Sequence, residues 1–211
     1  MADSNPTAFT DAAQTWNRRF EADGYLFGTE PNAWLREHAG LLRRGQRVLS
    51  VADGEGRNSV WLAQQGLAVD AFDVSSVGVA KARQLATERG VAVNFAISDV
   101  DGYPWPENAY DGVVAIFVQF ADPALRERLF ARIRRCLRPG GVLLLQGYTP
   151  KQLEYKTGGP PYASHLYTPE LLRDAFAGME LLEMREYEAV IQEGSGHHGR
   201  SALIGLAARR R

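Results

Sequence analysis

Two glycines and one carboxylate are the first residues in this sequence whose types and spacing indicate chemistry. Gly54 and Gly56 follow the apolar run 48–51, and a helical pattern begins after them. Glycines in such a turn let the backbone bend sharply and bring its N–H groups against a ligand. Asp73 follows Gly54 by nineteen residues and ends a second β-rich run, 69–73. A carboxylate at the tip of the second strand of a βαβ unit can accept hydrogen bonds from a ribose diol, so the spacing predicts a nucleoside pocket.

The other side chains of the turn argue against a dinucleotide as the ligand. Asp53 and Glu55 place two carboxylates where a pyrophosphate would lie, and Ser59 stands in place of the third glycine of a G-x-G-x-x-G motif. S-adenosylmethionine has no phosphate. It offers a zwitterionic amino acid, a sulfonium cation and a ribose, and all three are compatible with an acidic, glycine-rich turn. The turn therefore favours S-adenosylmethionine over a nicotinamide dinucleotide.

The elements that must position these residues alternate along the chain. Successive strands joined by helices imply parallel pairing with right-handed crossovers. The last two expected strands, 180–191 and 201–208, have no helix between them, which implies an antiparallel hairpin at the end of the sheet. The earlier strands are expected at 48–51, 69–73, 91–97, 110–117 and 142–146, and the helices between or after them at 58–65, 76–90, 123–137 and 169–176.

Length and composition indicate one soluble α/β domain. The chain has 211 residues, of which 45% are hydrophobic and 23% charged, enough for one well-packed core. The formal net charge of −1 creates no field that would attract nucleic acid or an anionic membrane. The single cysteine, Cys136, is expected to be a small core residue. No apolar run approaches the length of a membrane span and the first residues lack a signal-peptide pattern, so we expect a cytoplasmic protein.

We expect a single domain, 1–211, made of an N-terminal helical cover, 1–46, and an α/β core, 47–208. Two segments are expected to close over the pocket: 25–32 precedes the first strand, and 147–168 follows the fifth, whose carboxyl end faces the same crevice. Both are rich in glycine, proline and tyrosine. Since a methyl donor must be shielded from water, we expect ligand binding to order one or both segments. The alternative for 147–168 is a tolerated surface loop.

Taken together, the strand, the turn, the helix and Asp73 resemble the class I S-adenosylmethionine-dependent methyltransferases. Their first motif is usually an acidic residue followed by a G-x-G-x-G loop, and this chain departs from it at Ser50 and Ala52. The resemblance covers residues 47–208. It implies a Rossmann-like, seven-stranded, mostly parallel sheet in the order 3-2-1-4-5-7-6, with the last strand antiparallel and helices on both faces.

The resemblance also implies the residues that hold the cofactor. Asp73 would bind the ribose hydroxyls, Asp99 would reach the adenine amino group with Val100 beside the ring, and the glycine turn would hold the methionine end. Tyr25 and Phe27 are expected either to close over the cofactor, with an aromatic face toward the sulfonium, or only to pad the sheet. The expected cofactor-binding residues are Tyr25, Phe27, Gly28, Ala52, Asp53, Gly54, Gly56, Asp73, Val74, Asp99, Val100 and Phe117.

For the methyl acceptor, the sequence gives a weaker indication. Methyl transfer mainly needs alignment and exclusion of water, and an anionic or sulfur acceptor needs no strong base, which fits the lack of an obvious triad. The chain is most similar to the small bacterial tellurite-resistance and thiopurine methyltransferases, and the tellurite type carries His and Arg just before its last strand. His197, His198 and Arg200 occupy the matching place and are expected to bind the acceptor. Adjacent histidines rarely chelate one metal ion, so no metal site is expected.

Two other classes of function remain open at this point. A nicotinamide-dependent oxidoreductase would need pyrophosphate contacts and an active-site acid that the sequence does not reveal. A non-catalytic S-adenosylmethionine-binding protein would keep Asp73 and Asp99 but would need no organised acceptor pocket. For the methyltransferase, the expected partner is a small-molecule acceptor of the soft sulfur or chalcogen-oxyanion type, with neither nucleic acid nor membrane as a partner.

Overall fold

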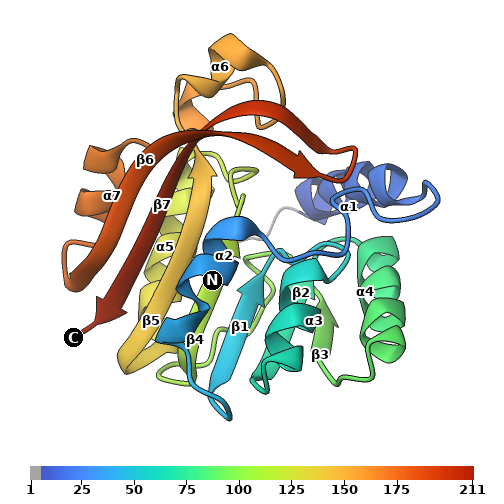
Figure 1. Cartoon of the computed structure of the whole chain (residues 1–211), viewed down its shortest axis with the longest axis horizontal. Helices are drawn as coiled ribbons and strands as arrows, with labels where there is room; N and C mark the ends of the chain where they lie inside the picture. The colour runs from blue at the N-terminus through green and yellow to red at the C-terminus, as the bar shows by residue number, and fades with distance from the viewer. Residues whose placement is uncertain (1–5) are drawn as a thin grey trace.

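A sheet of seven strands runs through the centre of the structure, a computed structural model that describes residues 6–211 (Figure 1). The strands lie in the order β3-β2-β1-β4-β5-β7-β6. Strands β1 to β5 pair in parallel, whereas β7 runs antiparallel to both β5 and β6. The strand order and the reversed last strand confirm the predicted fold. The strands are β1 (Arg47–Val51), β2 (Ala68–Asp73), β3 (Asn94–Ile97), β4 (Tyr110–Ile116), β5 (Leu137–Tyr148), β6 (Met179–Glu193) and β7 (His197–Arg210).

Helices cover both faces of this sheet, as predicted (Figure 1). Among residues 6–211, no helix combines the length and the apolar character needed to cross a bilayer. The helices are α1 (Pro6–Phe20), α2 (Ala33–His38), α3 (Arg57–Gln64), α4 (Ser76–Glu88), α5 (Pro123–Cys136), α6 (Gln152–Tyr155) and α7 (Pro169–Ala175), with short 3-10 turns at Ala39–Leu41 and Ala163–His165.

Two capping residues explain where the longer helices begin. The Ser75 hydroxyl accepts a hydrogen bond from Gly78 N at 2.9 Å and caps α4. Asp122 caps α5 by accepting from Leu125 N at 2.8 Å, with Pro123 in the first turn. Side chains of this kind satisfy backbone N–H groups that have no partner within the helix. Both caps fix the start of each helix after its strand.

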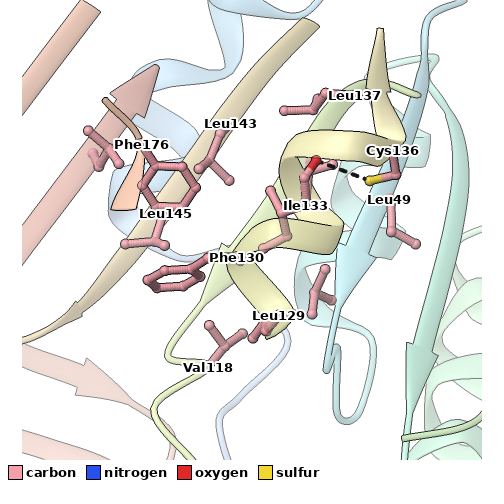
Figure 2. Packing of buried hydrophobic residues seen from close by; sticks show 14 of the residues in the cluster. Leu49, Val118, Leu129, Phe130, Ile133, Cys136, Leu137, Leu143, Leu145 and Phe176 are labelled. Carbon is pink, nitrogen blue, oxygen red and sulfur yellow. Dashed lines mark hydrogen bonds between the residues drawn. The ribbon is translucent and has the colours of Figure 1, made fainter. Parts of the chain in front are cut away.

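The face of the sheet covered by α5 and α7 carries the larger part of the core (Figure 2). Phe130 and Ile133 of α5 pack against Leu143 and Leu145 of β5, and all four are buried. Each such side chain contributes about 2 kcal/mol through its burial. Cys136 lies in the same cluster, where its thiol donates to Ile133 O and burial raises its pKa to about 12. A thiol held in this way is a poor nucleophile, so the expected structural role of Cys136 agrees with its surroundings.

The β6–β7 hairpin is longer than the sequence analysis expected. Residues 192–200 were expected to form a loop, but β7 begins at His197 and Glu193 pairs with it across a three-residue tip, 194–196. In Figure 1 the hairpin passes over the upper end of the sheet and ends beside the segment that follows α1. Gly196 N donates to Leu26 O at 2.9 Å there. The hairpin therefore covers the carboxyl ends of the parallel strands.

Other departures from the expected elements are smaller. Strand β3 starts three residues later than expected, whereas β5 already starts at Leu137, which pairs with Tyr110. Residues 138–141, which were expected in neither a helix nor a strand, thus belong to an irregularity within the β4–β5 pairing. The segment 147–168 is more regular than expected, since it contains the end of β5, α6 and a 3-10 turn. Gly159 packs so closely on Tyr148 that an added Cβ would lie 2.7 Å from its ring, which shows that this segment is seated on β5.

Candidate functional site

A cavity of about 530 Å³ lies at the carboxyl ends of β1 to β4, where open α/β sheets bind their ligands. It is closed from the other side by α1, by the segment after α1 and by the start of β7. The residues predicted from the sequence that line it are Phe27, Ala52, Asp53, Gly54, Asp73, Val74, Asp99, Val100, Phe117 and His197. The structure thus brings together most of the residues that the sequence analysis selected from distant parts of the chain.

The turn after β1 has a backbone that few residues adopt. Ala52 and Gly54 have φ of +49° and +61°, in the left-handed region that favours glycine. The carboxylate of Asp53 holds this shape from inside, because it accepts from Ser50 Oγ at 2.6 Å and from Ser59 N at 3.3 Å. Burial raises the pKa of Asp53, and the bonds from the two serines oppose that rise. The carboxylate of Asp53 is therefore committed to the turn, and only its backbone remains to hold the methionine end of a ligand.

These contacts also explain why serines stand at positions 50 and 59. Ser50 stands where an acid is common, and Ser59 stands where the third glycine of a dinucleotide motif would be. Both serines serve the buried carboxylate of Asp53. An acid in place of Ser50 would put two carboxylates side by side in a buried site, which is unfavourable without a cation.

Asp73 connects the turn after β1 to the start of α4. Its Oδ2 accepts from Gly54 N at 2.9 Å and its Oδ1 from Ser75 N at 2.8 Å. Burial raises the pKa of Asp73 to about 6, with a further rise from Asp53, while the backbone N–H groups lower it. Each carboxylate oxygen can accept a second hydrogen bond. Because Asp73 lines the cavity, a ligand diol can supply those donors.

Asp99 and Val100 follow β3 and line the cavity next to the end of β2. One oxygen of Asp99 accepts from Gly102 N at 2.6 Å, which fixes the carboxylate in its loop. Val100 is buried, with 3% of its surface exposed. A fixed acceptor beside an apolar side chain suits the edge and the face of a purine ring.

Aromatic rings form the wall opposite these carboxylates. Trp16 and Phe20 of α1 stack with centroids 5.4 Å apart, and Phe27 meets the edge of Phe20 at 6.2 Å. Phe117, at the end of β4, contributes another ring and has φ of +56°, which is uncommon for an aromatic residue. Both residues were expected to lie in the N-terminal helical cover, 1–46, but neither was predicted as part of the site. Their exposure to a cavity depends on which way α1 faces, and the helical period alone does not reveal that direction.

A buried group of charges at the hairpin was not predicted. Glu193 Oε2 lies 2.8 Å from Arg57 Nη2 and 3.3 Å from His197 Nδ1. Burial alone would raise the pKa of Glu193, but the hydrogen bond from His197 and the charge of Arg57 lower it to about 2. Burial lowers the pKa of His197, and Glu193 opposes that shift. His197, the member of the group that was predicted, is therefore held in a fixed orientation.

A second cavity of about 550 Å³ lies on the other side of Phe27 and Arg57, between the segment before α2 and strand β6. Asn32 links its walls, because its Nδ2 donates to Gln146 Oε1 at 2.6 Å and to Glu193 Oε1 at 3.0 Å. Both Phe27 and Arg57 line this space as well as the first cavity. The Glu193 group thus forms part of the partition between the two cavities.

Five predicted site residues do not line the main cavity. Gly56 faces away, since an added Cβ would lie 2.7 Å from Ala82 Cβ, so this glycine allows α3 to approach α4. Tyr25 packs on the Val60 cluster between α3 and α4, and Gly28 lies against Gly194 of the hairpin tip. These residues make packing contacts in this structure, and their expected contacts with the cofactor stay a prediction.

His198 and Arg200 are also absent from the lining of the main cavity. They were expected to share a loop with His197, whereas all three lie in a strand, where successive side chains point to opposite faces. His197 faces the cavity, so His198 and Arg200 face the other way and are exposed. Arg200 is paired with Glu188 at 2.6 Å on that outer face. The expected role of these two residues in binding an acceptor is therefore not supported by their positions.

One group of three side chains in the described part of the chain brings together donor atoms that could hold a metal ion, namely Glu37, His38 and Glu183. Arg185 lies 2.7 Å from Glu37 and 3.6 Å from Glu183. The guanidinium already neutralises both carboxylates, so the group is an ion-pair network and carries no metal proposal.

Comparisons with known proteins support the same fold. Residues 48–141, which include the glycine turn, Asp73 and Asp99, match the family described as a methyltransferase domain. Phosphoethanolamine N-methyltransferase 2 of Caenorhabditis elegans is 28% identical over 163 residues, which cover 71% of this chain and 37% of that protein. The matched part covers between 36 and 47% of four curated relatives, so the chain spans less than half of their length. The curated relatives are named for different acceptors, including phosphoethanolamine, sterols and tRNA.

Some solved structures have the same fold over nearly the whole chain although their sequence identity to it is low. A protein that converts a disulfide bond into a thioacetal group during echinomycin biosynthesis superposes with a TM-score of 0.75 at 20% identity, covering 95% of this chain and 90% of that one. TehB from Haemophilus influenzae gives a TM-score of 0.70 at 15% identity, covering 95% of this chain and 67% of that one. At such identities the likeness shows the fold alone, so the narrower resemblance to tellurite-resistance and thiopurine enzymes stays a proposal. The chain therefore has the Rossmann-like fold of these structures, and its residues 48–141 are similar to a methyltransferase domain.

Proposed function

We propose that the protein is an S-adenosylmethionine-dependent methyltransferase that acts on a small-molecule acceptor. The observation that carries this proposal is the placement of Asp73, a buried carboxylate at the tip of β2 whose two oxygens are aligned by Gly54 N and Ser75 N. Its pKa near 6 leaves it mostly ionised at neutral pH, and its remaining lone pairs suit the two hydroxyls of a ribose.

The cavity fits S-adenosylmethionine in its size and in its charges. A volume of about 530 Å³ lies within the usual range for small-molecule sites, about 300 to 1,000 Å³. The aromatic rings of Trp16, Phe27 and Phe117 suit a sulfonium cation, which is attracted by the faces of such rings. When bound, S-adenosylmethionine supplies an electrophilic methyl group on that sulfonium. The residues of this chain bind and orient it and keep water away from it.

The charges around the cavity favour a soft sulfur acceptor over a chalcogen oxyanion. An oxyanion needs a cation to receive it, but Arg200 lies on the outer face of β7. The two arginines that line the cavity are both paired, Arg57 with Glu193 at 2.8 Å and Arg128 with Asp101 at 2.9 Å. The surrounding carboxylates would further repel an anion. A neutral acceptor meets none of these penalties.

The two alternative functions have less support. A dinucleotide would bring its pyrophosphate to a turn that carries two carboxylates, Asp53 and Glu55. A non-catalytic S-adenosylmethionine-binding protein would not require the titratable His197 beside the cofactor cavity. Neither alternative explains the site as economically as methyl transfer does.

Two measurements test the proposal. In isothermal titration calorimetry, S-adenosylhomocysteine should bind one site per chain, whereas NAD⁺ and NADH should not bind. Transfer of a tritiated methyl group from S-adenosylmethionine to a mixture of small acceptors should then exceed the rate without acceptor. Binding of dinucleotides but not of S-adenosylhomocysteine would refute the proposal. Tight cofactor binding with no transfer to any acceptor would favour the non-catalytic alternative.

A further inference from the structure

The pair formed by Glu193 and His197 joins the hairpin to the main cavity. His197 Nδ1 lies 3.3 Å from Glu193 Oε2, and the imidazole packs against Phe27 and Phe117 with ring centroids 4.4 and 4.5 Å apart. His197 lines the same cavity as Asp73. The imidazole thus lies between the aromatic wall and the buried carboxylate of the hairpin, with a defined ring orientation.

Glu193 determines which nitrogen of His197 carries the proton. Three donors hold its carboxylate: Arg57 Nη2 at 2.8 Å, Asn32 Nδ2 at 3.0 Å and His197 Nδ1. These donors keep the carboxylate ionised, with a pKa of about 2, and an ionised carboxylate only accepts hydrogen bonds. Nδ1 must therefore be the protonated nitrogen. In the neutral ring Nε2 then has a free lone pair, and it forms no hydrogen bond with the residues that the structure describes.

The surroundings favour the neutral ring at physiological pH. The charged and titratable groups near His197 are Glu193 of β6, Arg57 of α3, Arg19 of α1 and the Tyr148 ring of β5. Burial lowers the pKa of His197 and the hydrogen bond to Glu193 raises it, while Arg57 and Arg19 add to the lowering. The net effect is a pKa below the ordinary value, so the Nε2 lone pair is available at neutral pH.

We propose that His197 is the general base of the reaction and takes the proton of an uncharged thiol or phenol acceptor. This inference rests on the proposed methyltransferase function. As the acceptor atom forms its bond to the methyl carbon, the bond between that carbon and the donor sulfur breaks and its electron pair goes to the sulfur. The proton of the acceptor passes to Nε2. The carboxylate of Glu193 stabilises the resulting imidazolium at Nδ1, and the proton passes to water when the product leaves.

The lining of the cavity supports this class of acceptor. Its two arginines are paired with carboxylates, so an anion finds no free cation there among the described residues. The rings of Phe27 and Phe117 suit an apolar or aromatic body. A neutral thiol or phenol is a weak nucleophile until its proton leaves, which a positioned base accelerates by about 10² to 10⁴. A base at His197 thus supplies what a neutral acceptor lacks.

The test compares His197→Gln with the matched control His198→Gln, which changes the neighbouring exposed histidine. Three probes serve as acceptors: benzyl mercaptan and 4-methoxyphenol are protonated at pH 7, and 4-nitrothiophenol is ionised. His197→Gln should lower kcat with the protonated probes by about 10² or more and change kcat little with 4-nitrothiophenol. It should also remove the rise of kcat/KM with pH below neutrality. His198→Gln should leave every rate unchanged, and both variants should bind S-adenosylhomocysteine like the wild type.

A second readout needs no acceptor. In the complex with S-adenosylhomocysteine at pH 7, ¹⁵N NMR should find His197 neutral, with the proton on Nδ1. A charged ring or a proton on Nε2 overturns the inference, as does an equal loss of rate with all three probes, which would indicate a structural role. Transfer by the wild type to 4-nitrothiophenol alone also overturns it. If S-adenosylhomocysteine does not bind the wild type, the proposed function itself fails, which is a separate result.

Discussion

The affinity for S-adenosylhomocysteine should fall as the pH is lowered through 6, because Asp73 loses its charge in that range. The ribose hydroxyls can only donate to a carboxylate whose lone pairs are free, and protonation occupies one of them. One pH unit below its pKa, about a tenth of Asp73 is ionised, so the affinity at pH 5 should be about tenfold weaker than at pH 7. Replacing the side chain altogether removes both hydrogen bonds to the ribose.

The size of that loss follows from the kind of hydrogen bond. Each bond from a hydroxyl to an ionised acceptor contributes about 1.5 kcal/mol, so Asp73→Ala should cost about 3 kcal/mol, or about a hundredfold in affinity. The pH dependence between 5 and 7 should disappear with the side chain. An exposed carboxylate on α7, Asp174, serves as the control, and Asp174→Ala should change neither the affinity nor its pH dependence.

The stability of the ligand-free protein should respond with the opposite sign. Burial raises the pKa of Asp73 from 3.8 to about 6, so between these values the native state binds more protons than the unfolded state. The contribution of Asp73 to the free energy of unfolding is therefore greatest below the unfolded pKa and is lost as the pH rises through 6. Between pH values well below the unfolded pKa and well above 6, the contribution of Asp73 to the free energy of unfolding should change by about 3 kcal/mol at most.

Two assays separate these effects. Calorimetric titration at several pH values measures the affinity, and urea unfolding of the wild type and of Asp73→Ala over the same pH range isolates the contribution of this residue to stability. Wild-type affinity that is unchanged between pH 5 and 7, or an Asp73→Ala variant that still binds S-adenosylhomocysteine as tightly, would refute the assignment of Asp73 to the ribose.

Three further predictions follow from the packing and the charges. Gly56→Ala should lower the free energy of unfolding by about 2 kcal/mol, because the new Cβ would lie 2.7 Å from Ala82 Cβ at a residue with φ of +89°. Thermal unfolding measures this loss, and an unchanged Tm would contradict the prediction. S-adenosylhomocysteine should protect one or both of the segments 25–32 and 147–168 from hydrogen exchange, and with segment 25–32 also the hairpin tip at 194–196; protection confined to 51–73 would contradict closure. RNA and DNA oligomers should not bind tightly, since the net charge is −1, and salt-sensitive binding in fluorescence anisotropy would contradict this.

The strands, their parallel pairing and the final hairpin could be predicted from the sequence because the signals for them are local, whereas the strand order came from the resemblance to methyltransferases. Alternating strand and helix periods fix the parallel pairing, the caps at Ser75 and Asp122 fix where two helices begin, and the missing helix before β7 fixes its reversed direction. The same local logic selected Asp73 and Asp99, since a carboxylate after a parallel strand must lie at the ligand edge of the sheet. No knowledge of tertiary contacts was needed for these predictions.

Residues that reach the cavity from outside the sheet could not be selected in this way. Trp16 and Phe20 lie on an amphipathic helix whose apolar side serves both packing and a ligand, and the helical period does not separate the two uses. Arg57 belongs to the first turn of α3 and would usually be read as a solvated residue. Its role appears only when Glu193, 136 residues later, is brought to 2.8 Å.

The hairpin shows how one wrong element changes a prediction about chemistry. As a loop, residues 192–200 made His197, His198 and Arg200 equivalent candidates for acceptor binding. In the strand, successive side chains point to opposite faces, so His197 points inward and the other two point outward. Of the three residues expected to bind an anionic acceptor, only the imidazole of His197 therefore lines the cavity. The Gly-Ser-Gly sequence at 194–196 carried the missing signal, because a short glycine-containing tip between β-rich runs is typical of a three-residue hairpin turn.

That turn also explains why a base can exist here without a triad in the sequence. A three-residue tip places the residues on either side of it directly across from one another, so Glu193 and His197 become a cross-strand pair although they are only four residues apart. Their contact depends on the length of the tip, and the burial of the pair depends on α3 supplying Arg57. The orientation of the imidazole is therefore set by the hairpin and its partner helix, while the carboxylates for the ribose are set by the sheet. Acceptor chemistry in this fold can then vary with the hairpin without any change to the nucleoside end of the site.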